Sequence, residues 1–406
     1  MKIDPNKTIN ELLVALSYAI DIENNKKIFH AWKVAILSAK IAENAAGPQK
    51  LKDIFYGGLL HDVGGVEFSH HIIHYLKRQD KASRNLLLSH PIVGAQLVSN
   101  LPQMTNAAKL ILDHHEWING SGYPRSKTQK FIPFGSQVIR MADAIDILLQ
   151  KWRSINFSEL KKRLSLNTNK EHTKILFRRA LDILKRSSFL KKISDHALLP
   201  GLFEEVRNGI GPLKVPAKID AIGSTLEIIS QIIDMKHPYT SGHSLRVSRY
   251  AIACALAMNL GHDEITEIKW AGLIHDIGKL SVSRRILDKP TPLTHKEFEI
   301  IKQHPYLTRK IMDMTPSLQD ITSVAANHHE FYDGTGYPLG LKGNEIPRGA
   351  RILSICDAFD AMTSNRPYRN PLTPQQACRE IEKHAGTQFD AEIVKQTLPL
   401  FRNLAL

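Results

Sequence analysis

The residues best suited to chemistry form the segment His275-Asp276-Ile277-Gly278-Lys279. It places a nitrogen ligand, a carboxylate and a cation close together, and imidazole with carboxylate is the ligand mix of a hydrolytic metal site rather than a thiolate structural one. On a helix, Lys279 would project from the same face as His275, because the two lie four residues apart. Its ammonium could then meet an anion that the metal holds. The doublet alone is weak evidence, since His-Asp pairs also serve as helix caps or surface groups.

A set of histidines and aspartates that includes this doublet recurs along the chain at a constant spacing. Residues His61, Asp62, His90, His114, His115 and Asp143 are followed 214 positions later by His275, Asp276, His304, His328, His329 and Asp357. His30 precedes its counterpart His243 by 213 positions, because one residue is gained near Gly261. The segment 114–124 likewise matches 328–338. This register predicts a tandem duplication of one domain.

The second copy offers more potential metal ligands than one ion needs. They comprise five histidines and two aspartates, namely His243, His275, Asp276, His304, His328, His329 and Asp357. Two ions ~3.5–4 Å apart would account for the number, and such a pair can clamp a phosphate for in-line attack. Asp276 would bridge them, with His243, His275 and Asp357 on one side and the other three histidines opposite. We expect two divalent ions, iron or manganese first, with nickel or zinc as alternatives.

Each of these residues also has a simpler interpretation. His243 stands at the head of an amphipathic helix and could be a hydrogen-bonded core histidine, and His304 precedes Pro305 and could merely start a helix. His328-His329 could be a surface pair. Asp357 is the hardest to explain in this way, because it lies among apolar residues and a buried carboxylate needs a partner. Together, and repeated in one register, the residues favour a metal centre.

The elements that must position these groups are predicted to be helices. Apolar residues recur at helical spacing over 8–45, over 158–187, from about Asp220 onward and over 374–402. No sustained alternating pattern indicates strands, so the expected fold is all-α, with two helical bundles. Pro200-Gly201, Gly209-Ile-Gly-Pro212 and Pro216 suggest a connector between the copies. The expected domains are 1–187 and 219–406, joined by a linker at 188–218.

Composition limits the classes of protein that the chain can belong to. Three dispersed cysteines (Cys254, Cys356 and Cys378) and the lack of a long apolar stretch favour a cytoplasmic protein with no membrane span. The net charge of +14 arises mostly in residues 151–218, where 16 Lys and Arg face six Asp and Glu. Solvated helix faces explain that excess better than a nucleic-acid site, because no zinc finger or RNA-binding aromatic signature accompanies it. Nucleic acid is therefore disfavoured as a partner.

The second copy resembles the HD-GYP family, the branch of the HD superfamily that hydrolyses cyclic dinucleotides. The resemblance covers about residues 220–400. It rests on four motifs: His243-Ser-x-Arg-Val247, His275-Asp-Ile-Gly-Lys279, His328-His-Glu-x-x-Asp-Gly-x-Gly-Tyr-Pro338 and Asp357-x-x-Asp-Ala-x-x-x-x-Arg-x-Tyr-Arg369. It implies that the two bundles are of the HD type and that the seven residues named above are metal ligands.

The same resemblance assigns roles to residues outside the ligand set. Lys279, Arg366 and Arg369 match groups that contact substrate phosphate, and Asp276 and Lys279 match catalytic groups. The Gly336-Tyr337-Pro338 loop is associated with substrate entry or with docking of protein partners, although it could simply be a turn. Two positions depart from the usual pattern. Thr308 stands where glycine is common, and His237 replaces a common acidic residue ahead of Tyr239, but neither departure falls at a ligand position. Some members that hold a third metal carry an acidic residue four positions before the first histidine; here that position is Tyr239, which favours two metals.

The first copy is expected to be a degenerate and regulatory version of the second. It keeps a counterpart for every ligand: His30, His61, Asp62, His90, His114, His115 and Asp143. Gly65, however, replaces Lys279, and Trp152 and Ile155 replace the two arginines. These histidines could hold metal, or they could persist only as packing and hydrogen-bonding groups. The copy could serve dimerisation, so a homodimer is one expectation, or regulation of its neighbour.

The resemblance makes a cytoplasmic phosphodiesterase that cleaves cyclic di-GMP the leading functional hypothesis. No motif identifies the base, so another cyclic dinucleotide such as 3'3'-cGAMP is the runner-up. A third hypothesis is a module that senses the nucleotide, or docks partner proteins, without turnover. Lys279, Arg366 and Arg369 are all present in the second copy, which favours catalysis.

Overall fold

A computed structural model describes residues 3–23, 26–27, 29–68, 81–152, 156–215, 220–237, 241–365 and 370–402. Helices dominate these residues, and the two strands among them, β1 (Ile22–Glu23) and β2 (Lys26–Lys27), are two residues long and pair only with each other. The predicted all-α fold is therefore confirmed. No described helix is long and apolar enough to cross a membrane.

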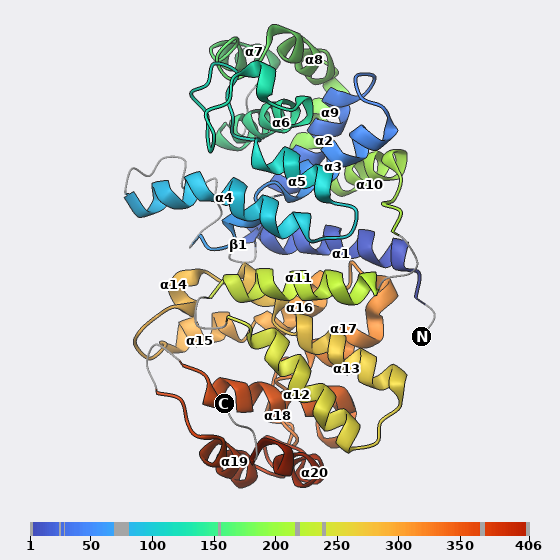
Figure 1. Ribbon diagram of the computed structural model, residues 1–406, viewed down its shortest axis with the longest axis vertical. Helices are drawn as coiled ribbons and strands as arrows, with labels where there is room; N and C mark the ends of the chain where they lie inside the picture. The colour runs from blue at the N-terminus through green and yellow to red at the C-terminus, as the bar shows by residue number, and fades with distance from the viewer. Residues whose placement is uncertain are drawn as a thin grey trace. The chain divides into compact units, whose positions relative to one another are not determined.

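The chain divides into two compact units, each of which contains one complete set of the repeated histidines and aspartates. One unit comprises Met1–Ala19, Glu23–Asn25 and Lys218–Leu406, and the other comprises Ile20–Ile22 and Lys26–Ala217. We name them the second-copy unit and the first-copy unit, respectively. Helices within each unit can be followed in Figure 1 by their labels.

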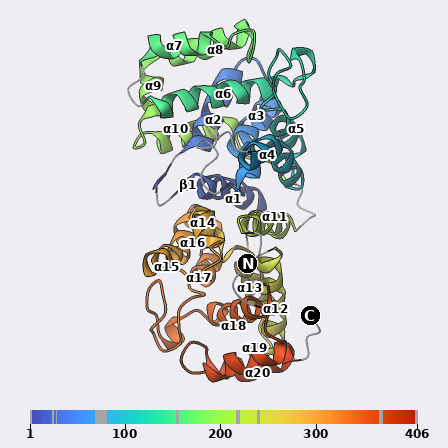
Figure 2. The same cartoon turned by 90° about the vertical axis from the view of Figure 1, so that its left-hand side faces the viewer.

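The first-copy unit is built around α2, which packs against α3 and α6. The described α-helices of this unit are α2 (His30–Ala42), α3 (Pro48–Leu60), α4 (Lys81–Ser99), α5 (Thr105–Leu112), α6 (Phe134–Lys151), α7 (Phe157–Ser165), α8 (Lys174–Leu184), α9 (Ser187–Ser194) and α10 (Leu199–Ile210). The described 3-10 helices η1 (Val63–Gly65) and η3 (Gln129–Phe131) lie between them. Helices α7 and α8 pack on each other and on α6, as Figure 2 shows.

The second-copy unit repeats this arrangement around α12, which packs against α13 and α18. Its α-helices after α1 (Pro5–Ile20) are α11 (Ala221–Met235), α12 (His243–Ala257), α13 (His262–Ile274), α14 (Arg284–Leu287), α15 (His295–Ile301), α16 (His304–Met312), α17 (Gln319–Ala326), α18 (Arg348–Thr363), α19 (Pro374–Lys383) and α20 (Ala391–Arg402). Its 3-10 helices are η5 (Ile277–Ser281), η6 (Pro316–Leu318) and η7 (Gly343–Glu345). Asp220 caps α11 by accepting a hydrogen bond from the Gly223 amide at 2.9 Å, at the helix start that the sequence indicates.

The segment expected to be a linker is largely helical. Pro200 occupies the first turn of α10, where its missing N–H costs no hydrogen bond, and Gly211 ends that helix with a φ of 75°. Pro200 and Gly211 thus bound a helix of the first-copy unit, which extends to Ala217. Phe203 on the apolar face of α10 stacks on Trp32 with ring centroids 4.2 Å apart, which ties the helix to the first-copy unit.

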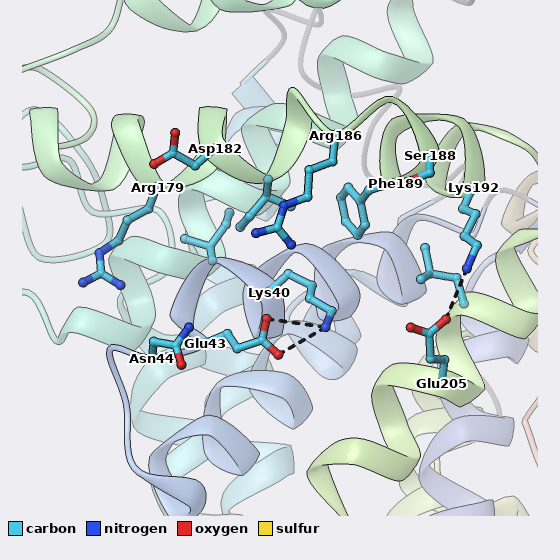
Figure 3. Close-up of a pocket in the computed structure, with 13 residues that line it drawn as sticks. Lys40, Glu43, Asn44, Arg179, Asp182, Arg186, Ser188, Phe189, Lys192 and Glu205 are labelled. Carbon is cyan, nitrogen blue, oxygen red and sulfur yellow. Dashed lines mark hydrogen bonds and ion pairs between the residues drawn. The ribbon is translucent and has the colours of Figure 1, made fainter.

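Helices α9 and α10 also create the pocket of Figure 3, which they form with the ends of α2 and α8. Both helices follow α8, which is the counterpart of α20, the last described helix of the second copy. The pocket therefore lies outside the part of the fold that the two copies share. Its lining is mainly charged, and two of its three carboxylates are paired: Lys40 with Glu43 at 3.2 Å and Lys192 with Glu205 at 3.3 Å. Arg179 and Arg186 line the same pocket.

The first helix also differs from the expected domain boundary. By sequence register α1 corresponds to α11, but it clusters with residues 218–406 and not with the first copy that follows it. The Glu11 carboxylate on α1 accepts a hydrogen bond from the Ser317 hydroxyl at 2.8 Å. Apolar spacing identifies a helix and its buried face, but it does not say which bundle that face will join, and this is why the sequence misplaces the helix.

Candidate metal centre

The second-copy unit brings its predicted ligands to one place by using the ends of helices. His243 and His304 begin α12 and α16, while His275 and His328 follow directly, or after one residue, the last turns of α13 and α17. Asp357 projects from the middle of α18. The chain changes direction at the end of a helix. Neighbouring residues such as His275 and Asp276, or His328 and His329, therefore lie where several helix ends meet.

A glycine permits the close approach of two of these corners. A Cβ on Gly278 would lie 2.0 Å from the His304 carbonyl oxygen, so no larger residue fits between η5 and α16. The Thr308 hydroxyl bridges the same contact, donating to the His275 carbonyl at 2.9 Å and accepting from the Gly278 amide at 3.1 Å. Thr308 does not occupy a ligand position, as expected from the sequence, but its hydroxyl holds the backbone of the candidate ligand His275.

The ring nitrogens that face away from the centre each contact an acceptor. The Nδ1 atom of His243 lies 2.7 Å from the Asp360 carboxylate. The Nδ1 atoms of the other three buried histidines point to main-chain carbonyls: His275 to Gly272 at 2.8 Å, His304 to Ile301 at 2.8 Å and His328 to Ala325 at 2.7 Å. Since an acceptor beside Nδ1 places the proton there, the neutral rings present Nε2 lone pairs to the centre.

Asp276 lies between two groups of these nitrogens. Its Oδ2 atom is 3.5 Å from His275 Nε2 and 3.7 Å from His243 Nε2, whereas Oδ1 is 3.3 Å from His304 Nε2 and 3.9 Å from His328 Nε2. Asp357 Oδ1 lies 3.3 Å from His243 Nε2. The two oxygens of one carboxylate thus face the two sides that a bridging ligand would serve.

A divalent cation fits the chemistry of this arrangement. His275 Nε2 and Asp276 Oδ1 are buried without a hydrogen-bond partner in the part of the chain that the structure describes. His304 Nε2 and His328 Nε2 lie 3.3 Å apart, although both carry lone pairs in the neutral tautomers. Lone pairs that converge in a buried site need a cation between them. The donor atoms of His243, His275 and Asp276 lie within 4.8 Å of one another, as do those of His304, His328 and His329.

The charge states of the histidines also suit ligation, which requires neutral imidazole. Burial lowers the pKa of His304, holds that of His328 well below its usual value and lowers that of His329 to about 3. His243 is the exception. Burial opposes its protonation, but the carboxylates of Asp357 and Asp360 outweigh that effect and raise its pKa to about 9.

Lys279 contacts Asp276, with Nζ 2.5 Å from Oδ2, and its side chain is partly exposed. Burial alone would raise the pKa of Asp276, but Lys279 and the surrounding imidazoles hold it well below the ordinary value. The lysine therefore reaches the centre without being a ligand. Arg366 and Arg369, the other predicted phosphate contacts, lie outside the described residues, as do Tyr239 and Ile155.

Two residues that support the centre were not assigned a role from the sequence. The Asp360 carboxylate contacts His243 Nδ1 and also accepts two hydrogen bonds from the Arg246 guanidinium. Arg246 Nε lies 2.6 Å from Oδ1, and Arg246 Nη2 lies 3.0 Å from Oδ2. Both residues belong to motifs that the sequence displays, His243-Ser-x-Arg246 and Asp357-x-x-Asp360. Their one-turn spacing from a ligand was the available signal, because such residues share the ligand's helix face.

The Gly336-Tyr337-Pro338 loop packs against the centre. The Tyr337 ring lies over His329, with centroids 5.0 Å apart, and the Tyr337 amide donates to the His329 carbonyl at 3.1 Å. A Cβ on Gly336 would come within 2.1 Å of the Phe331 amide nitrogen, which explains the glycine. Buried Glu330 fixes the loop by accepting from the amides of Leu339 and Leu341. The loop thus positions a candidate ligand, whereas its docking of partners remains a prediction.

The first-copy unit assembles its seven counterparts in a similar way. His30 Nδ1 lies 2.7 Å from Asp146, and the Nδ1 atoms of His61, His90 and His114 face the carbonyls of Gly58, Leu87 and Ile111. Asp62 is again central. Its Oδ2 is 3.3 Å from His61 Nε2 and its Oδ1 is 3.5 Å from His90 Nε2. The donor atoms form two groups, Asp62 with His90, His114 and His115, and His30 with His61 and Asp143.

With both sites in view, the chain belongs to the HD domain family, whose sequence profile matches residues 11–167 and 227–393. The predicted family is thereby confirmed, and the two matched ranges support the tandem duplication. A cyclic di-GMP phosphodiesterase of Thermotoga maritima is 40% identical over 187 residues, which is 46% of this chain and 51% of that protein. The chain thus spans about half the length of this relative.

Two further comparisons extend over more of the chain. The 3'3'-cGAMP-specific phosphodiesterase 3 of Vibrio cholerae is 29% identical over 326 residues, covering 79% of this chain and 68% of that protein. The crystal structure of a cyclic GMP-AMP specific phosphodiesterase of V. cholerae is similar over 98% of each chain, with a TM-score of 0.68 and 22% identity. At that identity the structural likeness shows the fold alone.

Proposed function

We propose that this protein is a metal-dependent phosphodiesterase that hydrolyses a cyclic dinucleotide at the second-copy centre. The observation that carries the proposal is the position of Asp276, whose two oxygens face two groups of imidazole nitrogens and whose Oδ2 also contacts a lysine. The activities of the Thermotoga and Vibrio relatives support a cyclic dinucleotide as the substrate class.

His243, His275 and Asp357 would hold one ion and His304, His328 and His329 the other, with Asp276 shared between them. When bound, two such ions supply Lewis acidity and a water nucleophile of lowered pKa. The chain's own groups do the rest. Asp360 and Arg246 orient the His243 ring, Thr308 holds the His275 backbone, and Tyr337 packs on His329.

Lys279 would stabilise the charge that develops on the phosphate. Its ammonium contacts Asp276 Oδ2. A phosphate oxygen at the centre can compete for that ammonium, because Lys is a flexible donor with three protons. We propose the same role for Arg366 and Arg369, whose guanidinium groups suit bidentate phosphate contacts.

Cyclic di-GMP is the first candidate substrate and 3'3'-cGAMP the second. The relative with 40% identity bears a name that specifies cyclic di-GMP, while the relative that covers 79% of the chain bears one that specifies 3'3'-cGAMP. The three cysteines are free, which fits the cytoplasmic location that we propose for the protein. A homodimer and a regulatory first copy are further predictions.

The test is anaerobic purification, elemental analysis, and chromatography of products from a panel of cyclic dinucleotides. The parent chain should convert at least one of them, and Asp276→Ala should abolish turnover together with the metal bound at the second-copy centre. Asp320→Ala is the matched control, because that carboxylate is exposed at the start of α17, the helix that leads to His328. Near-parental turnover in Asp276→Ala would refute the assignment, and tight binding without product from any dinucleotide would favour a sensor.

A further inference from the structure

The first-copy unit contains a buried ion pair network, formed by Arg140, Asp143 and Glu171, whose cation and outer carboxylate have no charged counterparts at the aligned positions of the second copy. The Arg140 side chain is only 13% exposed, and its guanidinium lies 2.5 Å from Asp143 Oδ2 and also contacts the Glu171 carboxylate. Asp143 is one of the seven ligand counterparts, and its other oxygen lies 3.5 Å from His30 Nε2. One candidate ligand is therefore already engaged by a cation from its own chain.

The corresponding positions of the second copy are uncharged. Arg140 aligns with Ser354 in the 214-residue register. Asn119 and Asp333 are counterparts in the 214-residue register, and their amides donate to the carbonyls of Lys170 and Thr387, respectively. Lys170 therefore corresponds to Thr387, an offset of 217 residues, and the next residue, Glu171, corresponds to Gln388. The ligand beside them differs in access as well, since the Asp357 side chain is 16% exposed and that of Asp143 is 5%.

This network changes what the first-copy unit can bind. A divalent ion among His30, His61 and Asp143 would lie next to the Arg140 guanidinium, which already neutralises the carboxylate and would repel a second positive charge. Arg140 forms its ion pairs with Asp143 and Glu171, whereas the other group, Asp62, His90, His114 and His115, is a buried set of four donors within 4.8 Å of one another. Four protein ligands with no open position are typical of a structural ion rather than a catalytic one.

We propose that the first-copy unit holds a single divalent ion on Asp62, His90, His114 and His115, and that Arg140, fixed by Glu171, excludes the second ion by withholding Asp143. The ion stabilises the unit and takes no part in turnover. This inference goes beyond the proposed function, although both rest on the premise that converging imidazoles bind metal.

The test counts ions in full-length chains whose other centre is disabled. Asp276→Ala removes the shared ligand of the second centre, so this chain should retain one ion, and Asp62→Ala/Asp276→Ala should retain none. Adding Arg140→Ser and Glu171→Gln to Asp276→Ala gives the first copy the residues of the second and should raise the content from one ion to two. Arg140→Lys in the same background keeps a cation and should leave one ion.

A reciprocal exchange keeps the proposal testable if the first-copy variants do not fold. In an Asp62→Ala chain, Ser354→Arg with Gln388→Glu transfers the network to the second centre and should lower its content from two ions to one. A second readout is thermal unfolding: a chelator should lower the melting temperature of Asp276→Ala but not of Asp62→Ala/Asp276→Ala.

Two ions in Asp276→Ala, none in that chain, or unchanged contents in both exchanges would overturn the proposal. The proposed function is judged separately, from product formation by the parent chain. A parent that hydrolyses a dinucleotide while Asp276→Ala holds no ion would therefore refute the inference and leave the proposed function standing.

Discussion

Replacing Asp360 by asparagine should weaken metal binding without removing any ligand. The His243 Nδ1 proton is accepted by Asp360 Oδ2 at 2.7 Å, and the Arg246 guanidinium donates to both oxygens of the same carboxylate. An asparagine can keep only one of these relations. If its oxygen faces His243, its NH2 group meets the guanidinium, donor against donor. If its NH2 group faces His243, the ring must protonate Nε2 and loses the lone pair that would bind metal.

The magnitude follows from the role of this carboxylate as an outer partner of one ligand. Removing such partners typically lowers metal affinity or activity by about 10–100-fold, or ~1.4–2.8 kcal/mol. We expect the upper part of this range, because both side chains of the His243–Asp360 contact are 2% exposed and water can replace the lost hydrogen bond only poorly. The first copy retains the contact, with His30 Nδ1 2.7 Å from Asp146.

The assay is competition with a chelator of known affinity, under anaerobic conditions, on full-length chains. Arg246→Lys provides a graded comparison, since the first copy has Lys33 at that position, 3.5 Å from Asp146, and it should weaken affinity less than Asp360→Asn. Asp320→Asn controls for the substitution itself. Parental affinity in Asp360→Asn, or a loss that appears only in turnover at saturating metal, would refute this account of how the ring is oriented.

Three further predictions concern the same centre. Lys279→Met should retain its ions and lose turnover by about 10²–10³-fold, as expected when one electrostatic contact to the transition state is removed; elemental analysis beside steady-state rates measures this, and joint loss of ions and rate would show that the lysine is misassigned. Thr308→Val should lower the free energy of unfolding by about 1–3 kcal/mol in urea titrations, because the buried His275 carbonyl and Gly278 amide lose their shared partner; Thr308→Ser should lose much less, and equal losses would contradict the hydrogen-bond explanation. Metal affinity should rise with pH up to about 9, because binding must release a proton from His243. Burial lowers the pKa of this histidine, but Asp357 and Asp360 outweigh that effect and raise it to about 9. An affinity that is flat across this range would count against His243 as a ligand.

The sequence predicts the repeated ligands and the helical class because both are written in residue types and spacing. The 214-residue register links His61 with His275 whatever the backbone does, and apolar periodicity marks the helices. Most of what orients the rings is invisible at that level. The acceptors for His275, His304 and His328 are main-chain carbonyls, which every residue possesses.

Other features escape the sequence because they depend on which distant groups meet. Arg140 looks like one more charge on a helix until the fold places it against Asp143 and Glu171. Thr308 looks like a neutral departure from a glycine position until its hydroxyl is seen between His275 and Gly278. The proline and glycine residues at 200–212 suggest a linker from sequence because these residue types are common both in linkers and at the starts and ends of helices.

The membership of α1 in the second-copy unit has a consequence for the order in which the protein can assemble. This helix is synthesised before the first-copy unit, whereas most of the residues with which it forms a compact unit begin at Lys218. At about 5–20 residues per second, roughly 10–40 s of translation separate α1 from those partners. Leu12, Leu13 and Leu16 are buried in the finished protein and must be shielded by something else during that interval. The second-copy unit therefore cannot close around α1 until the intervening first copy has been synthesised.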